Sequence, residues 1–324
     1  IGFGDHYWLV AILPDQKSEV TMRFSYAEQS ERYQTDFWGA EQTVPPGGAA
    51  EVVGRLFAGA KELRVIEDYE ERLGVDKFNL AIDFGWFYFL AKPIFKLLHI
   101  FNDRIGNFGV SILLLTLLIK IIFFPLANKS YRSMGKMKKL QPEMLKIRER
   151  YKEDKPRVNQ EMMALYKKEK VNPASGCLPM IVQIPVFIAL YQLLFATIEM
   201  RHAPFFWWIQ DLSSPDPTNF VNLFGLLPFS PEGFVPDFLL IGIWPLVMGI
   251  SMFLQQKLNP TPPDPVQAKV FMFLPLIFTF MLARFPSGLV IYWTWNNILS
   301  IGQQWVIMKR AGAFGAQPKK KAKT

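Results

Sequence analysis

The sequence has little of the residue chemistry on which most catalytic and metal sites depend. It holds one cysteine, Cys177, and three histidines, His6, His99 and His202, which are far apart in the chain. One cysteine excludes an internal disulfide and any multi-cysteine metal site. The HExxH pattern, the glycine-rich phosphate loop and the GxSxG pattern are also missing. We therefore expect no catalytic residues, no bound metal and no cofactor, and predict that the protein is not an enzyme.

Acidic residues are missing from the long apolar runs in the second half of the chain. The five runs are 107–127, 178–198, 238–254, 270–283 and 288–308. Such runs are typical of transmembrane helices, because lipid offers the backbone no hydrogen-bond partner outside the helix. The sequence predicts an α-helical membrane protein with five transmembrane helices, of which the fourth is short for a full crossing. No carboxylate is available inside these runs to form an intramembrane ion pair.

The N-terminal segment, residues 1–78, has a different composition from the rest. Apolar and polar residues alternate in short runs between 6 and 58, for example EVTMRFSYAE at 19–28, and turn residues such as PPGG at 45–48 separate them. This pattern is typical of β-strands, while 61–73 is helical in pattern. The segment has a net charge of −6. Because Ile1 lies in a strand-like stretch, we expect that an N-terminal portion of the natural protein is missing.

Residues 79–104 predict an amphipathic helix. Its polar residues fall at spacings of 4, 3 and 4 on one helical face, and its aromatic and leucine residues lie elsewhere. The polar set is Lys92, Lys96, His99 and Asp103, and the apolar set is Phe89, Phe95, Leu98 and Phe101. A helix of this kind lies in the membrane interface. A buried helix of a soluble domain is the alternative.

Lysine and arginine are distributed unevenly over the predicted connections. Residues 129–176 contain fourteen of them, whereas the next connection, 199–237, contains only Arg201. Positive charge favours the cytoplasmic side. We therefore expect 129–176, the second loop 255–269 and the basic tail 309–324 in the cytoplasm, and the N-terminal domain on the opposite side.

The basic loop 129–176 predicts a helical hairpin. Its first half carries an apolar seam, a break follows at Asp154-Lys155-Pro156, and the seam continues beyond it. The seam is formed by Met137, Leu140, Met144, Ile147, Tyr151, Val158, Met162 and Leu165. Two short antiparallel helices satisfy this pattern. The net charge of +8 either holds the loop inside or contacts an anionic partner such as lipid headgroups or ribosomal RNA. Candidate partner contacts are Lys136, Lys138, Lys139, Arg148 and Arg150.

Lys120 is a single charge inside the first apolar run. It lies seven residues before Ala127, which corresponds to about 10 Å of helix rise. A lysine near the centre of a span costs roughly 2.5–3.5 kcal/mol. Either the side chain extends to the inner surface or it faces a hydrated cavity. Thr116, one turn away, and Gln183 could line such a cavity, as could Thr294, Asn296, Asn297, Gln303 and Gln304. Interhelical hydrogen bonds are the alternative role for each.

Several stretches together resemble the YidC family of membrane protein insertases. They are GCLPMIVQIPVFIALYQLL at 176–194, LIKIIFFPLANKS at 118–130, GLVIYWTWNNILSIGQQ at 288–304 and GFGDHYWLVAILPDQ at 2–16. The resemblance implies a bacterial inner-membrane insertase and assembly chaperone. Residues 1–78 would be the end of a periplasmic β-sandwich, residues 105–308 would form the insertase core, and a first span would precede them.

The resemblance also implies a groove that is open to the cytoplasm and to lipid. Lys120 and Thr116 match its positive residue, usually arginine, and the threonine one turn earlier. Lysine keeps the charge but lacks the planar fork of arginine. The remaining expected groove contacts are Gln183, Tyr292, Trp293 and Asn297, and the hydrophobic slide would contain Ile184 and Phe187.

Expected partners are nascent membrane proteins, the ribosome, the Sec translocon and membrane lipids, with no small-molecule substrate. The alternative function is an anion-binding secondary transporter or channel, with Lys120 holding the anion. The sequence shows neither the internal repeat nor the acidic ion site that such a transporter would have.

Overall fold

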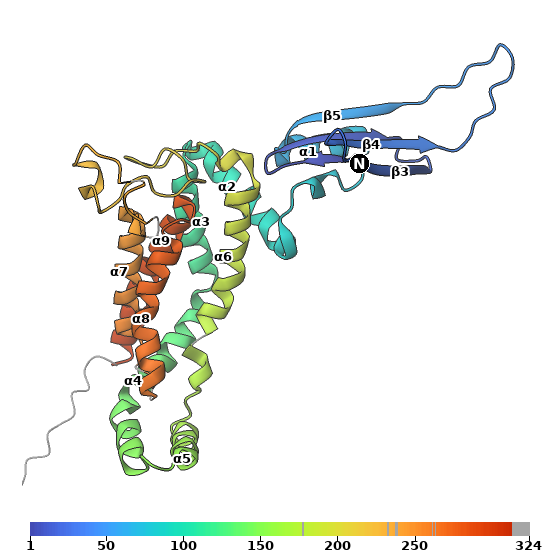
Figure 1. Cartoon of the computed structure of the whole chain (residues 1–324). Coiled ribbons are helices and arrows are strands. Elements are labelled where there is room, and N and C mark those ends of the chain that lie inside the picture. The colour runs from blue at the N-terminus through green and yellow to red at the C-terminus, as the bar shows by residue number, and fades with distance from the viewer. Residues whose placement is uncertain (177, 232, 237–238, 261, 263, 313–324) are drawn as a thin grey trace, which may run out of the picture.

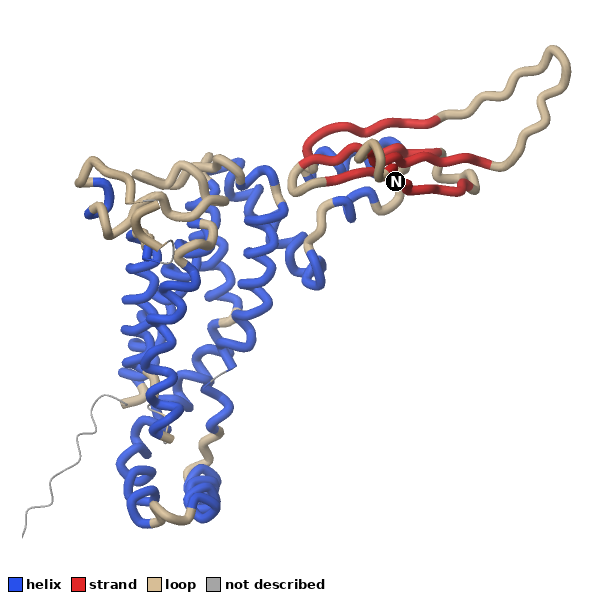
Figure 2. The backbone as a smooth tube through the Cα atoms, in the orientation of Figure 1, coloured by secondary structure: helices blue, strands red, loops and turns tan. Residues whose placement is uncertain are grey.

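The computed structural model describes residues 1–312 apart from 177, 232, 237–238, 261 and 263. A strand-rich N-terminal part projects sideways from one end of a helical bundle, and a helical hairpin extends beyond the other end (Figures 1 and 2). Cys177 and most of the basic tail, 313–324, lie outside the described residues.

The N-terminal strands form two antiparallel sheets. One has the order β1 (Gly2–Gly4), β2 (Trp8–Pro14), β5 (Gly54–Ala60), and the other pairs β3 (Val20–Ala27) with β4 (Arg32–Gly39). The sheets meet at aromatic rings, since Phe3 lies 5.8 Å from Phe24 and 6.2 Å from Tyr33 between ring centroids. The predicted strands are therefore confirmed. The predicted helix is α1 (Leu63–Leu73), whose Tyr69 packs on Phe57 of β5.

The amphipathic segment forms two 3₁₀ turns, η1 (Phe78–Ala81) and η2 (Gly85–Phe87), and the helix α2 (Tyr88–Ile105). Its polar face is paired with α1: Lys92 lies 2.7 Å from Glu67, and Asp103 lies 2.7 Å from Arg64. These ion pairs connect the N-terminal part to the bundle. The position of α2 in a membrane interface stays a prediction.

His99 departs from the predicted polar face. It is buried against the rings of Phe95 and Phe108, at centroid distances of 4.3 and 5.4 Å. Loss of hydration lowers the pKa of His99 to about 4, so this side chain is neutral at ordinary pH. The spacing of the polar residues correctly predicted which side of α2 carries His99, but Phe108 of α3 packs on that part of the helix.

The apolar runs form helices that pack side by side. They are α3 (Phe108–Ile122) with the first part of α4 (Phe124–Arg150), α6 (Leu178–Ala196), α7 (Ile243–Leu258), α8 (Pro265–Leu282) and α9 (Ser287–Arg310). The connections include the 3₁₀ turns η3 (Pro173–Gly176), η4 (Ile198–Met200) and η5 (Leu223–Gly225). α7 begins five residues after the start of the predicted run 238–254 and ends four residues after its end.

Length and hydropathy alone single out few of these helices. In the part of the chain that the structure describes, no helix is by itself long and apolar enough to cross a membrane. The pair α3 and α4 meets that criterion together, with a bend of 69° between its halves. Residues 181–196 and 266–282 are shorter apolar helices. The count of five transmembrane helices therefore stays a prediction.

The bend corrects the prediction of one straight helix over 107–127. The helix breaks at Phe123, and α4 begins at Phe124 with Pro125 in its first turn. Proline lacks the backbone N–H and has a fixed φ, so it suits the start of a helix and not its interior. α4 has 27 residues in all and ends at Arg150, with Pro142 in its interior. The first helix of the hairpin is thus not a short separate helix.

The rest of the hairpin agrees with its apolar seam. α5 (Lys155–Lys168) begins after Asp154, whose side chain accepts a hydrogen bond from Arg157 N at 3.0 Å. Met144, Met162, Leu165 and Tyr166 are buried together between α4 and α5, and Leu140, Ile147 and Val158 pack around them. Six of the eight predicted seam positions therefore pack together between the two helices, whereas Met137 and Tyr151 lie outside this cluster.

Close packing of α7 against α8 depends on Gly249. A Cβ atom at this position would overlap the hydroxyl of Thr279 on α8. We expect Gly249→Ala to lower the free energy of unfolding by about 1–3 kcal/mol, because small residues allow helices to approach and overpacking forces them apart. Denaturation in detergent micelles measures this. Gly302→Ala is the matched control, since open space surrounds its Cβ position; equal destabilisation by both changes would contradict the packing argument.

A carboxylate from the bundle supports the start of α1. Glu199 of η4 accepts a hydrogen bond from Leu63 N at 3.2 Å, while the N-cap residue Glu62 gives no side-chain cap. Burial raises the pKa of Glu199 above its ordinary value. Because the charged form is penalised when α1 is docked, docking strengthens as the pH falls through the raised pKa and weakens above it.

We therefore expect Glu199→Gln, which keeps the acceptor and removes the charge, to protect α1 amides from hydrogen exchange at least as well as the unsubstituted protein at neutral pH. Glu199→Ala removes the acceptor and should lower that protection by about tenfold, the effect of a lost cap. Protection that is the same in all three proteins would show that Glu199 has no part in docking α1.

Candidate functional site around Lys120

Lys120 lies in the last turn of α3, where positive charge is favoured by the helix dipole. Its side chain is half-buried, and Nζ donates to the Ser300 hydroxyl on α9 at 2.7 Å. That hydroxyl donates in turn to the carbonyl of Asn296 at 2.7 Å. The bend at Phe123 follows within one turn. The estimate of 10 Å to the inner end assumed a straight helix and does not apply to this bent one.

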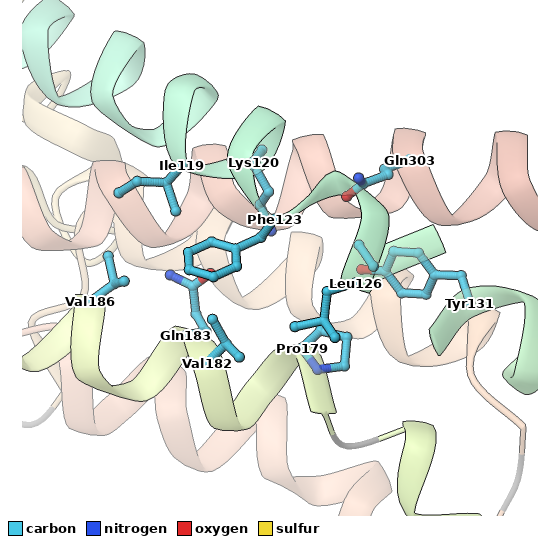
Figure 3. Close-up of a pocket in the computed structure, with 11 residues that line it drawn as sticks. Ile119, Lys120, Phe123, Leu126, Tyr131, Pro179, Val182, Gln183, Val186 and Gln303 are labelled. Atoms are coloured by element: carbon cyan, nitrogen blue, oxygen red, sulfur yellow. The ribbon is translucent and has the colours of Figure 1, made fainter. Parts of the chain in front are cut away.

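A small cavity adjoins the lysine (Figure 3). Its volume is about 30 Å³, enough for roughly two or three water molecules. Residues from α3, α4, α6 and α9 line it, and Lys120 and Gln183 point toward the same space from α3 and α6. The lining residues are Ile119, Lys120, Phe123, Leu126, Ala127, Tyr131, Pro179, Val182, Gln183, Val186 and Gln303. The cavity is thus polar at Lys120, Gln183 and Gln303 and otherwise mostly apolar.

Two predicted groove residues have different surroundings. Thr116 is buried one turn from Lys120, and its hydroxyl donates to the carbonyl of Ile112 at 2.7 Å within the same helix. It does not line the cavity. Gln183 does, and its amide donates to the hydroxyl of Tyr292. This hydrogen bond joins α6 to α9.

The aromatic residues of the last helix bring the predicted slide to the site. Tyr292 is buried, whereas the ring of Trp293 packs edge-on against Phe187 of α6 at a centroid distance of 4.6 Å. Ile184, one turn away on α6, is exposed on the outer surface. Phe187 and Trp293 therefore form one apolar contact between α6 and α9, with Ile184 outside it.

Asn297 is not brought to Lys120. It is buried, and its amide donates to the Ser251 hydroxyl of α7 at 3.0 Å. Its position is explained by helix geometry, because Asn296 and Asn297 are adjacent and point to different sides of α9. Asn297 thus forms an interhelical hydrogen bond, the alternative role considered for the polar residues of the apolar runs. It does not line the cavity beside Lys120.

Ser300 and Tyr131 belong to the site but were not predicted. Ser300 follows Asn296 by four residues and precedes Gln303 by three, which places all three on one face of α9. This spacing was a usable signal. In the described part of the chain, the buried Asn296 Oδ1 and Gln303 Oε1 have no hydrogen-bond partner. Such atoms are costly to bury, so this face of α9 has unmet hydrogen-bonding capacity. Tyr131 lies beyond the apolar run and carried no such signal.

The basic residues predicted for partner contact all lie on α4. Lys139 Nζ donates to the carbonyl of Ala311 at 2.8 Å, next to the end of α9. Lys138 precedes Lys139 directly and Lys136 lies about one turn earlier, while Arg148 and Arg150 lie in the last turn of α4. No group of three metal-ligating side chains gathers among the residues that the structure describes.

Fold and site together define a class: a mostly helical protein with a strand-rich domain at one end and a half-buried lysine between apolar helices. Residues 100–313 match the family described as 60Kd inner membrane protein, and residues 1–97 match the YidC periplasmic domain. The chain belongs to this family of inner membrane proteins, which confirms the resemblance seen in the sequence.

Similar curated proteins share one name, "Membrane protein insertase YidC". The chain is 59% identical over 315 residues to "Membrane protein insertase YidC" of Beijerinckia indica, covering 96% of this chain and 52% of the relative. It is 57% identical to the protein of that name from Methylobacterium sp. (strain 4-46), covering 96% and 50%, and 56% identical to that of Brucella suis, covering 96% and 51%. The chain thus spans about half the length of the curated relatives it matches.

One solved structure shares the fold. It is described as "Active YidC insertase crystal structure with the first transmembrane domain resolved", with a TM-score of 0.52 and 22% sequence identity, over 92% of this chain and 63% of that one. The family consists of non-catalytic membrane insertion factors, as the prediction of a non-enzyme requires. The names of the relatives favour the insertase prediction over the anion transporter.

Proposed function

We propose that the protein is a membrane protein insertase and assembly chaperone that moves short hydrophilic segments across the bacterial inner membrane. The observation that carries this proposal is Lys120, a half-buried cation between apolar helices whose hydrogen-bond partner is the neutral Ser300 hydroxyl. A cation held this way keeps its charge available to an acidic group that enters the site. The names of the relatives support the same function.

The first physical step is recognition of an acidic segment. A carboxylate that approaches Lys120 replaces the contact with Ser300 by an ion pair, and the attraction is stronger beside an apolar wall than in bulk water. The bend after Phe123 places this charge at the end of α3, where the cavity between α3 and α6 begins. Opening that small cavity into a hydrated groove in the inner leaflet shortens the apolar path that the segment must cross.

The second step is release of the client's apolar helix into lipid. Phe187 and Trp293 form an apolar contact beside the cavity, and Ile184 continues the apolar surface outward along α6. Burial of the client helix in lipid drives release, and the membrane potential adds about 2.3 kcal/mol per 100 mV for each negative charge moved outward. No covalent bond forms or breaks in this scheme.

The orientation follows the charge distribution. The N-terminal domain, residues 1–78, lies in the periplasm with 79–104 at the interface; the hairpin 129–176, the loop 255–269 and the tail 309–324 lie in the cytoplasm. The hairpin and tail contact the ribosome and membrane lipids, and the Sec translocon is a further partner. The positive charge concentrated on α4 supports this assignment.

The test is reconstitution of the protein in liposomes without other factors. A small single-span client with an acidic N-terminal segment should become protected from protease on the far side when the insertase is present. Small-anion flux is measured in liposomes with and without the protein, and equal flux in the two shows that the protein does not make the bilayer leak. Saturable flux of a small anion without client insertion would replace this proposal by the transporter alternative.

A further inference from the structure

A second cavity lies at the base of the hairpin, where α4 leaves the bundle and the chain returns from α5 toward α6. It is open and has a volume of about 550 Å³. Its lining residues are Pro125, Asn128, Lys129, Arg132, Ser133, Lys136, Lys170, Asn172 and Ser175. Four of these nine are cations and none is an acid. The cavity is separate from the one beside Lys120 and has the charge of an anion site.

The cations of this cavity have no acidic partner within the chain as described. The ion pairs of the described residues include none from Lys129, Lys136 or Lys170. Arg132 donates to the neutral side-chain oxygen of Asn128, at 3.1 Å. Like charges that are gathered without counterions repel one another, so an anion that binds among them relieves that repulsion.

The wall opposite α4 is held in place by a hydrogen bond from α4 and by one within the wall. The Ser130 hydroxyl donates to the carbonyl of Ser175 at 2.5 Å, and the Ser175 hydroxyl donates to the carbonyl of Asn172 at 2.6 Å. A fixed wall keeps the cavity open before a ligand arrives, and this lowers the cost of binding.

Lys170 is held at this wall by an unusual backbone. It has a φ of 51° just after α5, in the left-handed region that glycine usually occupies at helix ends. A lysine in this conformation turns the chain toward Asn172 and adds its side chain to the cavity lining. The conformational cost of a non-glycine residue here points to a use for the side chain.

The surroundings identify the class of anion. Three apolar residues that precede the lining residue Pro125 in the sequence are exposed: Ile121 by 62%, Ile122 by 62% and Phe124 by 47%. Exposed apolar surface therefore comes directly before the cations along the chain. We propose that this cavity binds the phosphate of an anionic phospholipid in the cytoplasmic leaflet, with Arg132 and the lysines on the phosphate and the acyl chains along that apolar face. This inference rests on the orientation given under the proposed function.

The test is lipid retention by the full chain. The protein is purified in nanodiscs that contain phosphatidylglycerol and phosphatidylcholine in equal amounts and released for native mass spectrometry. The variant replaces three lining cations: Lys129→Gln, Arg132→Gln and Lys170→Asn, where asparagine tolerates the left-handed backbone. We expect the unsubstituted protein to retain phosphatidylglycerol selectively and the variant to lose that preference by about tenfold or more.

The control carries the same change of charge elsewhere on the hairpin. Lys146→Gln, Lys152→Gln and Lys168→Gln alter exposed lysines that do not line the cavity, and should leave retention unchanged. Equal retention by both triple variants overturns the proposal. So does displacement of the lipid by excess inorganic phosphate, which would indicate a free-anion site, or tighter binding of a short RNA that the cavity variant alone loses. Client insertion is measured separately, so failure of lipid binding leaves the proposed function standing.

Discussion

Replacing Lys120 by glutamate is expected to reduce insertion of a client with an acidic translocated segment by about tenfold or more, which corresponds to about 1.4 kcal/mol. The negative side chain repels the incoming carboxylates that lysine attracts. It also takes the place of the cation that donates to Ser300 from the last turn of α3. The effect is measured in cells that are depleted of the natural insertase and express the variant, as the fraction of the client that becomes protected from protease. Lys120→Ala, which removes attraction without adding repulsion, should have an intermediate effect.

Two variants show whether charge or packing is responsible. Lys120→Arg keeps the charge and should retain most activity, although the larger fork has to fit a cavity of about 30 Å³. Ser300→Ala removes only the neutral partner of the lysine and should leave insertion of acidic clients nearly unchanged. Insertion of a client with a neutral translocated segment should not change with the charge at position 120. If alanine and glutamate variants insert acidic clients as well as the unsubstituted protein, charge attraction is not the mechanism.

Periodicity in the sequence was sufficient for much of the fold. Alternation predicted the strands, and apolar runs predicted the helices around Lys120, because these signals reflect which side of an element is covered. The hairpin seam around Met144 and Met162 was predicted in the same way. Resemblance to a family added the periplasmic assignment of the N-terminal residues, which the match of residues 1–97 supports.

The positions of individual side chains could not be predicted from such signals. Pro125 is a sequence signal for the new helix that begins after Phe123, but the size of the bend between α3 and α4, 69°, cannot be deduced from a run that is apolar on both sides of it. Asn297 and Gln183 have similar chemistry, yet one bonds Ser251 away from the lysine and the other lines its cavity. Which helix faces which polar residue is a tertiary property. Thr116 shows the same limit, because its hydroxyl is used by its own helix.

Shortening the hairpin is the second change with a large expected effect, and the structure dictates where to cut. Met134 is buried with Ala127, Tyr131 and Ile307, so a deletion that reaches it would damage the bundle. Met144 and Tyr166 are in contact across the hairpin, with Sδ and Oη 3.9 Å apart. Residues 145–165 can therefore be replaced by a short glycine-serine linker. We expect this deletion to lower client insertion by at least about tenfold, the scale of losing a docking contact.

This deletion separates the two roles that the basic loop can have. It removes Arg148 and Arg150 but keeps Lys129, Arg132 and Lys136, the positive charges nearest the apolar helices. Those residues are sufficient to hold the loop in the cytoplasm, so a purely topogenic role predicts full insertion with unchanged protease accessibility of the tail. A partner-binding role predicts correct topology with little insertion. The double variant Arg148→Gln and Arg150→Gln keeps the apolar seam of the hairpin, and loss of insertion there as well would assign the contact to charge and not to shape.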